Sequence, residues 1–130
     1  MSGDGHKTNA LADAVVAQFA VMQAMPLDPA LYLIATPIGH LGDISIRALD
    51  TLARCDVIYC EDTRHTRKLL QRYALRPRLE SYHEHNADRQ RGPILTALNA
   101  GQRIALVSDA GTPLVSDPGH KLVAAVRDAG

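Results

Sequence analysis

The sequence alternates between two local patterns, and this alternation constrains the fold more than any other feature. Apolar-rich runs of strand length at residues 31–35, 56–60 and 103–107, and a shorter predicted strand at 79–82, are each followed by a segment with helical spacing of apolar residues. The connections are too long for hairpins, so successive strands are expected to run parallel, with helices crossing between them. We therefore predict an α/β fold, a mostly parallel sheet with helices on both faces. Because the first run, 31–35, is apolar throughout, we expect that strand to be covered on both faces.

Residues 1–29 look separate from this pattern. The polar, Gly-containing segment 1–9 predicts disorder, and the Ala-rich segment 10–25 predicts an amphipathic helix that Pro26 and Pro29 end. The α/β domain is then expected over residues 30–130, with helices near 45–54, 61–73, 87–99 and 122–129. Gly92-Pro93 is expected to kink the third of these or start it afresh. Because four-stranded parallel sheets usually continue, we expect this domain to be the N-terminal part of a larger protein.

Charge and cysteine content exclude few partners by themselves. The 14 basic and 14 acidic residues balance, so net charge does not indicate a nucleic-acid partner. No apolar run approaches the roughly 20 residues of a membrane span, and no signal peptide is expected. Cys55 and Cys60 form neither a disulfide framework nor a zinc motif, and we expect free thiols in a cytoplasmic protein.

The basic residues are unevenly distributed. Six lie between residues 64 and 78, with no acidic residue among them. Such a run is typical of a solvated helix face, and the alternative is a surface that binds phosphate. The six residues are Arg64, Arg67, Lys68, Arg72, Arg76 and Arg78.

The segment from Ser108 to Gly119 is long for a connection between a strand and a helix. Its twelve residues include two Gly, two Pro and two Asp, whereas a structural connection of this kind usually has about 2–6 residues. Loops at 37–43, 61–64 and 83–86 should leave the same edge of a parallel sheet, where open α/β folds bind ligands. The first loop by itself also fits a simple turn. Neither GxGxxG nor GxxxxGK[ST] occurs, which excludes a P-loop ATPase.

Several side chains in these loops are candidates for proton transfer. Glu61 and Asp62 are adjacent carboxylates at a predicted helix start, where they either cap the helix or accept a proton. His83 and His85 alternate along a predicted strand and should face the same side. The pair is expected to contact substrate or to form a polar structural cluster. No third ligand is spaced to complete a metal site, so no metal is expected.

Four blocks, in this order along the chain, resemble a known family. They are LIATPIGHLGDIS at 33–45, EDTRHTRKLL at 61–70, YHEHN at 82–86 and the loop at 108–119. Together they resemble the tetrapyrrole methylase superfamily, in particular its branch that methylates small-subunit ribosomal RNA. The departures are His40, where the family usually has Asn, and Ser45, where it has Thr.

The resemblance implies S-adenosylmethionine bound in a cleft between two α/β domains, of which the second is absent here. This sequence alone is therefore expected to bind the cofactor weakly and to be inactive. The reaction implied is 2′-O-methylation of a cytidine ribose in the decoding region of 16S RNA, by a cytoplasmic homodimer. The implied cofactor contacts are Pro37, Asp109, Ala110, Gly111, Thr112 and Val115.

The chemistry of ribose methylation also indicates which residues could act as the base and which could bind RNA. A ribose hydroxyl is a weak acid, so a base is expected, and the candidates in order are Glu61, Asp62 and His83. The residues expected to bind RNA are Arg64, Arg67, Lys68 and, by stacking on a base, Tyr82.

Two other functions remain open at this stage. One is methylation of a corrin or porphyrin precursor, although relatives with that activity carry a GxGPGDP-type first loop that residues 36–43 do not match. The other is a catalytically silent module that binds RNA or a nucleotide.

Overall fold

The protein is built around a four-stranded parallel sheet with the strand order β1-β4-β2-β3. The computed structural model describes residues 3–37, 39–108 and 117–130. The strands are β1 (Leu31–Ala35), β2 (Val57–Cys60), β3 (Arg78–Ser81) and β4 (Ile104–Ser108). The helices that follow them are α2 (Ile46–Arg54), α3 (Thr63–Arg72), α4 (Ala87–Asn99) and α5 (Asp117–Ala129). This order confirms the predicted α/β class.

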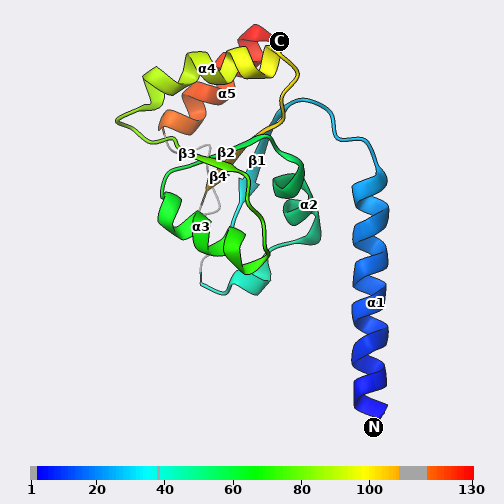
Figure 1. Cartoon of the computed structure of the whole chain (residues 1–130). Coiled ribbons are helices and arrows are strands. Elements are labelled where there is room, and N and C mark those ends of the chain that lie inside the picture. Colours follow the sequence, from blue (N-terminus) through cyan, green and yellow to red (C-terminus); the bar gives the residue numbers. More distant parts are fainter. Residues whose placement is uncertain (1–2, 38, 109–116) are drawn as a thin grey trace.

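Helices cover both faces of the sheet, and each face has its own core (Figure 1). On one face, side chains of α2 and α3 such as Leu52 and Leu70 pack on Ile58 of β2 and Val107 of β4. On the other face, α4 and α5 pack on alternate residues of the same strands. That second core includes Tyr59, Ile94, Leu106 and Leu122. Residues 104–107 of β4 are all apolar and buried, and the strand lies between β1 and β2, as expected for a strand covered on both faces.

Strand β1 differs from the prediction made for it. We expected a strand covered on both faces, but β1 lies at an edge of the sheet and Leu33 is 39% exposed. Only Ile34 of this strand is buried. An apolar run shows that a segment can be buried, but the position of that segment in the sheet depends on pairing with distant residues.

Helix α4 also differs. It runs from Ala87 to Asn99 as one helix through Pro93, so the restart that we considered there does not occur. Proline removes one backbone hydrogen bond and crowds the preceding turn. The next residue, Ile94, is completely buried against the sheet, and this packing compensates for the lost hydrogen bond.

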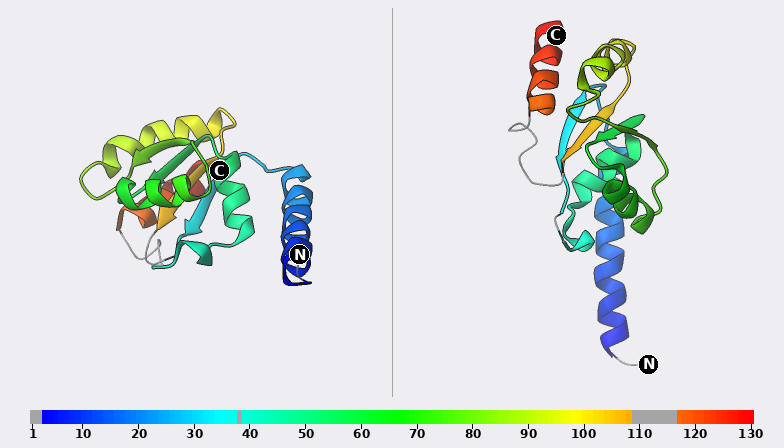
Figure 2. Two further views of the ribbon diagram at one scale, coloured as in Figure 1. Left: turned by 60° about the horizontal axis from the view of Figure 1, so that its bottom comes forward. Right: turned by 90° about the vertical axis from the view of Figure 1, so that its left-hand side faces the viewer.

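Helix α1 (Gly3–Ala24) stands beside the α/β domain and projects well past it (Figures 1 and 2). It begins at Gly3, seven residues before the predicted helix start at residue 10. Extending an existing helix costs little per residue compared with starting one. The prediction of an amphipathic helix is wrong, because apolar residues lie all around its axis. Even so, no helix in the described part of the chain is both long and apolar enough to span a membrane.

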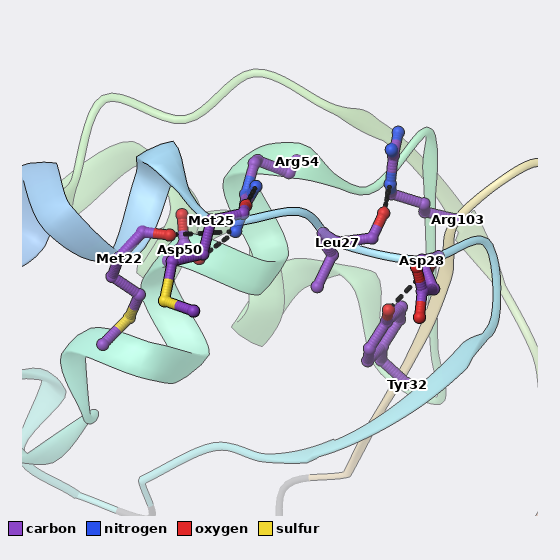
Figure 3. A network of polar contacts seen from close by, with 8 residues as sticks. All are labelled: Met22, Met25, Leu27, Asp28, Tyr32, Asp50, Arg54 and Arg103. Carbon is purple, nitrogen blue, oxygen red and sulfur yellow. Dashed lines mark hydrogen bonds and ion pairs between the residues drawn. The ribbon is translucent and has the colours of Figure 1, made fainter.

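Arg54 at the end of α2 holds the last turn of α1 (Figure 3). Its guanidinium donates hydrogen bonds to the carbonyl oxygens of Met25 at 2.6 Å and Met22 at 3.3 Å. It also forms an ion pair of 2.8 Å with the buried carboxylate of Asp50. A cation at the C-terminus of a helix satisfies carbonyl groups that have no partner within the helix. The ion pair with Asp50 in turn fixes the position of that cation.

Two further side chains hold the segment between α1 and β1. Arg103 donates to the carbonyl oxygen of Leu27 at 2.5 Å, and Tyr32 donates to that of Asp28 at 2.5 Å (Figure 3). The backbone N–H of Arg103 is itself fixed by Asp56 at 2.8 Å. The linker is therefore attached to the sheet at several points.

Candidate functional site

The carboxyl ends of all four strands lie level with one another. Ala35 pairs with Ser108, and Cys60 pairs with both Val107 and Ser81. The segments that begin at Pro37, Glu61 and His83 therefore leave the same edge of the sheet. At about 4.8 Å per strand, β1 and β2 are separated by roughly 10 Å, with β4 between them.

This edge contains a reversal of connection direction. The chain leaving β1 and β2 leads to α2 and α3 on one face of the sheet, whereas the chain leaving β4 leads to α5 on the other face. In open α/β sheets the ligand usually binds at such a switch point, in a crevice at the carboxyl ends of the strands, and we call this part of the edge the crevice. Of the six predicted cofactor contacts, Pro37 is described and half-buried at this edge. The other five, Asp109, Ala110, Gly111, Thr112 and Val115, lie outside the described residues.

Thr36 ties the first loop to the end of β4. Its backbone N–H donates to the carbonyl oxygen of Ser108 at 2.8 Å, and its hydroxyl donates to the same oxygen at 3.1 Å. The side chain is buried, so both groups find their partner inside the protein. Thr36 therefore holds Pro37 next to the start of the long loop. We did not predict this role, although a hydroxyl residue ending an apolar strand was its signal.

The two adjacent carboxylates have different surroundings. Asp62 is the N-cap of α3, and its carboxylate accepts a hydrogen bond of 3.0 Å from the backbone N–H of Arg64. This hydrogen bond, together with the nearby Arg64 guanidinium at 3.5 Å, lowers the pKa of Asp62. Glu61 is exposed, and among the described residues its carboxylate has no hydrogen bond or ion pair. Asp62 therefore caps α3, whereas the carboxylate of Glu61 has no such structural role among the described residues.

His83 and His85 do not lie on a strand, contrary to our prediction. Strand β3 ends at Ser81, and residues 83–86 form a turn. The backbone N–H of His85 donates to Nδ1 of His83 at 3.1 Å, and the two rings meet edge to face with 5.8 Å between centroids. Because Nδ1 accepts this bond, the neutral ring of His83 carries its proton on Nε2. The lone pair on Nδ1 is thus already used, so His83 is a weaker candidate base than Glu61.

Asn86 shapes that turn and was not predicted to matter. Its side-chain oxygen accepts from the backbone N–H of His83 at 2.8 Å. Its amide nitrogen donates to the carbonyl oxygen of Ser81 at 3.0 Å and to the Ser81 hydroxyl at 2.9 Å. The side chain is buried, so these bonds are shielded from water. The only signal in the sequence was an Asn directly before a predicted helix.

Tyr82 cannot serve as the stacking surface that we predicted for RNA. Its ring is only 3% exposed and packs edge-on against Tyr59, with 6.3 Å between centroids. Burial raises the pKa of Tyr82. The assignment to RNA binding is corrected: in this structure Tyr82 is part of the core beneath α4 and α5.

Helix α3 presents a basic face to solvent. Leu69 and Leu70 lie three and four positions after Thr66, and all three are buried on one side of the helix. In the described part of the chain, Arg67 and Lys68 form no ion pair with a carboxylate. The exposed residues of this face are Arg64, Arg67, Lys68, Gln71 and Arg72. The face is solvated, and apart from Arg64, which lies 3.5 Å from Asp62, its cations are available to bind an anion.

Among the described residues, no group of three or more His, Cys, Asp and Glu side chains is placed to hold a metal ion. Cys55 and Cys60 are buried free thiols. Burial raises the pKa of Cys55 to about 11, which keeps that thiol protonated near neutral pH.

Residues 30–130 match the family model described as tetrapyrrole (corrin/porphyrin) methylases. The chain belongs to the tetrapyrrole methylase family. It is also similar to three proteins named ribosomal RNA small subunit methyltransferase I. The first, from Mesorhizobium japonicum, is 59% identical over 107 residues, which are 82% of this chain and 36% of that protein. The second, from Synechocystis, is 57% identical over 99 residues, 76% of this chain and 36% of that protein. The third, from Escherichia coli O157:H7, is 52% identical over 100 residues, 77% and 35% respectively. The chain thus spans about a third of the length of the curated relatives it matches.

Proposed function

We propose that this protein takes part in the S-adenosylmethionine-dependent 2′-O-methylation of a cytidine ribose in the decoding region of 16S ribosomal RNA. The observation that carries the proposal is the shared sheet edge where the segments beginning at Pro37, Glu61 and His83 leave the strands, in a chain 59% identical over 107 residues to a protein named ribosomal RNA small subunit methyltransferase I. We propose further that the protein acts in the cytoplasm as a homodimer. Since the relatives are longer, residues outside this sequence complete the cofactor site in this proposal.

The chemistry of the edge suits this cofactor. A switch point offers backbone N–H and carbonyl groups at the ends of neighbouring strands, and these recognise the polar parts of a nucleotide-like ligand. Thr36 fixes the first loop against β4, and Pro37 follows it at the crevice. When bound, S-adenosylmethionine supplies an electrophilic methyl group on its sulfonium. The residues that would hold it are Pro37, Asp109, Ala110, Gly111, Thr112 and Val115.

In this proposal, Glu61 accepts the proton of the attacking ribose hydroxyl. It is exposed at the crevice edge and has no other partner among the described residues. Base catalysis of this kind contributes typically about 10²–10⁴-fold. Asp62 and His83 rank behind it, because the carboxylate of Asp62 caps α3 and Nδ1 of His83 accepts a backbone hydrogen bond. The protein also aligns the ribose hydroxyl with the methyl donor, and this alignment supplies the rest of the rate enhancement.

The basic face of α3 begins beside these groups. Arg64 lies at the first turn of α3, next to Asp62. In our proposal Arg64, Arg67 and Lys68 bind phosphates of the RNA and hold the target ribose at the crevice.

The cofactor assignment is tested by titration calorimetry with S-adenosylmethionine on the full-length protein. We expect Asp109→Ala to weaken cofactor binding at least tenfold, because the carboxylate at the start of the long loop is lost. Asp128→Ala, an exposed acidic position on α5, is the matched control and should bind as the wild type does. Equal affinities for the two variants would refute the assignment.

A further inference from the structure

A hollow of about 430 Å³ lies beside the C-terminal half of α3, between that helix, the turn after it and the start of β3. Its exposed rim is made by Arg67, Gln71 and Arg76, and its half-buried floor by Leu75, Pro77 and Leu79. The rim offers two cations and an amide, and the floor offers aliphatic surface. This combination fits a ligand that is anionic at one end and apolar at the other.

The shape of the hollow is fixed by the way α3 ends. The backbone N–H of Leu75 donates to the carbonyl oxygen of Leu70 at 2.8 Å. The backbone N–H of Ala74 donates to the backbone carbonyl oxygen of Gln71 at 3.1 Å. These two bonds are the signature of the Schellman motif, in which the residue after the helix cap is left-handed. Ala74 takes this conformation, with φ of 57°. The motif folds the chain back sharply and sets Arg76 on the same hollow as Arg67.

The cations around the hollow are not neutralised by the protein. Within the described part of the chain, Arg67, Lys68, Arg72 and Arg76 form no ion pair with a carboxylate. Arg78, the next basic residue, differs from them because its guanidinium forms an ion pair of 3.6 Å with the carboxylate of Glu80. Like charges kept close together at a surface repel one another, and an anion bound between them relieves that repulsion.

The exposed side of α3 joins this hollow to the crevice. Arg64 stands at the crevice end, and Arg67, Lys68 and Arg72 follow along the same side of the helix. Ten residues of helix span about 15 Å. A polyanion whose reacting group lies at the sheet edge would therefore reach the hollow along a continuous line of cations.

We infer that the hollow is a subsite for one nucleotide of the RNA substrate, distant from the nucleotide that reacts. Its phosphate binds between Arg67 and Arg76, and its ribose or base lies over the aliphatic floor at Leu75 and Pro77. This inference rests on the proposed function, because it takes RNA as the substrate. Because Tyr82 is buried and cannot stack on a base, aliphatic side chains make the contact to the sugar or base in this subsite.

The test is the salt dependence of RNA binding by the full-length protein. A short, fluorescein-labelled single-stranded RNA is titrated at several salt concentrations, and binding is followed by fluorescence anisotropy. The test variant is Arg67→Gln/Arg76→Gln. The control is Arg47→Gln/Arg89→Gln, which removes the same charge from exposed positions on α2 and α4.

We expect the test variant to bind RNA at least tenfold more weakly near 0.1 M salt. Its plot of log affinity against log salt concentration should be shallower by about 0.7, the value for one lost phosphate contact on a single strand. The control should keep the wild-type slope. Cofactor affinity should be the same in all three proteins, since the hollow is away from the crevice.

Three results would overturn the inference. Wild-type RNA affinity and slope in the test variant would refute the subsite and leave the proposed function intact. Equal weakening in both variants would show that only total charge matters, which also refutes the subsite. The absence of any RNA binding by the wild type would refute the subsite and the proposed function together.

Discussion

Helices α1 and α3 are attached to the rest of the protein in different ways. The ten-residue α3 buries Thr66, Leu69 and Leu70 on one side and exposes basic residues on the other. The 22-residue α1 is richer in apolar residues, yet of its residues 9–24 only Phe19 and Met22 are even half-buried. The comparison shows that separation of apolar from polar residues, and not apolar content, decides how a helix packs.

The two helices are also held in different places. Helix α3 is held along its buried side, whereas α1 is held mainly at its last turn by Arg54. A groove of about 350 Å³ remains between α1 and α2, lined by Phe19, Ile46 and Leu49 among others. The contact between α1 and α2 is thus open compared with the packing of α3, and α1 should respond differently to substitution.

The largest expected difference comes from truncating one leucine in each helix. Leu69 in α3 is 1% exposed, and Leu69→Ala should lower the free energy of unfolding by about 2–5 kcal/mol because it leaves a cavity. Leu11 in α1 is 68% exposed, and Leu11→Ala should change it by no more than about 0.5 kcal/mol. Urea denaturation measures both. A large loss for Leu11→Ala would contradict the exposed position of this part of α1.

Removing the anchor of α1 should have the next largest effect. Arg54→Ala leaves the buried Asp50 carboxylate without its cation and should cost about 3 kcal/mol of unfolding free energy. Hydrogen exchange should also speed up in the last turns of α1, since Met22 and Met25 lose their donors. Asp50→Asn/Arg54→Ala is the matched control and should recover part of the stability. Unchanged exchange in α1 would show that Arg54 does not anchor it.

The smallest effect concerns the start of α3 and depends on pH. The hydrogen bond from the backbone N–H of Arg64 keeps the pKa of Asp62 in the folded protein below that of the unfolded chain. The ionised carboxylate therefore adds stability above about pH 4, and this contribution is lost as the pH falls through the folded-state pKa. The stability difference between the wild type and Asp62→Asn, measured by denaturation at a series of pH values, should shrink on acidification. A difference that grows instead would contradict the capping role.

The sequence was sufficient to predict much of the fold, because burial imposes a local pattern. Each strand and helix of the α/β domain lies close to its predicted position, although α5 begins at Asp117, earlier than the predicted residue 122. The edge position of β1 was missed because strand order depends on pairing between distant segments. The extent and packing of α1 were missed because its apolar composition does not indicate where the helix begins or which side of it packs.

The sequence predicted the positions of some candidate site residues correctly and those of others wrongly. The shared edge followed from parallel strands alone, so Pro37 and Glu61 could be placed there without coordinates. Tyr82 could not be assigned correctly, since its burial depends on Tyr59 in the neighbouring strand. The turn at His83 was missed because it depends on the side chain of Asn86.

The most direct test of the whole account is methyl transfer from labelled S-adenosylmethionine to small ribosomal subunits by the full-length protein. The label is located by nuclease digestion and mass spectrometry, and wild type is compared with Glu61→Gln and Asp62→Asn. We predict a labelled cytidine ribose, a rate about 10²-fold lower for Glu61→Gln, and a smaller loss for Asp62→Asn. Label on a base, or a wild-type rate for Glu61→Gln, would contradict the account.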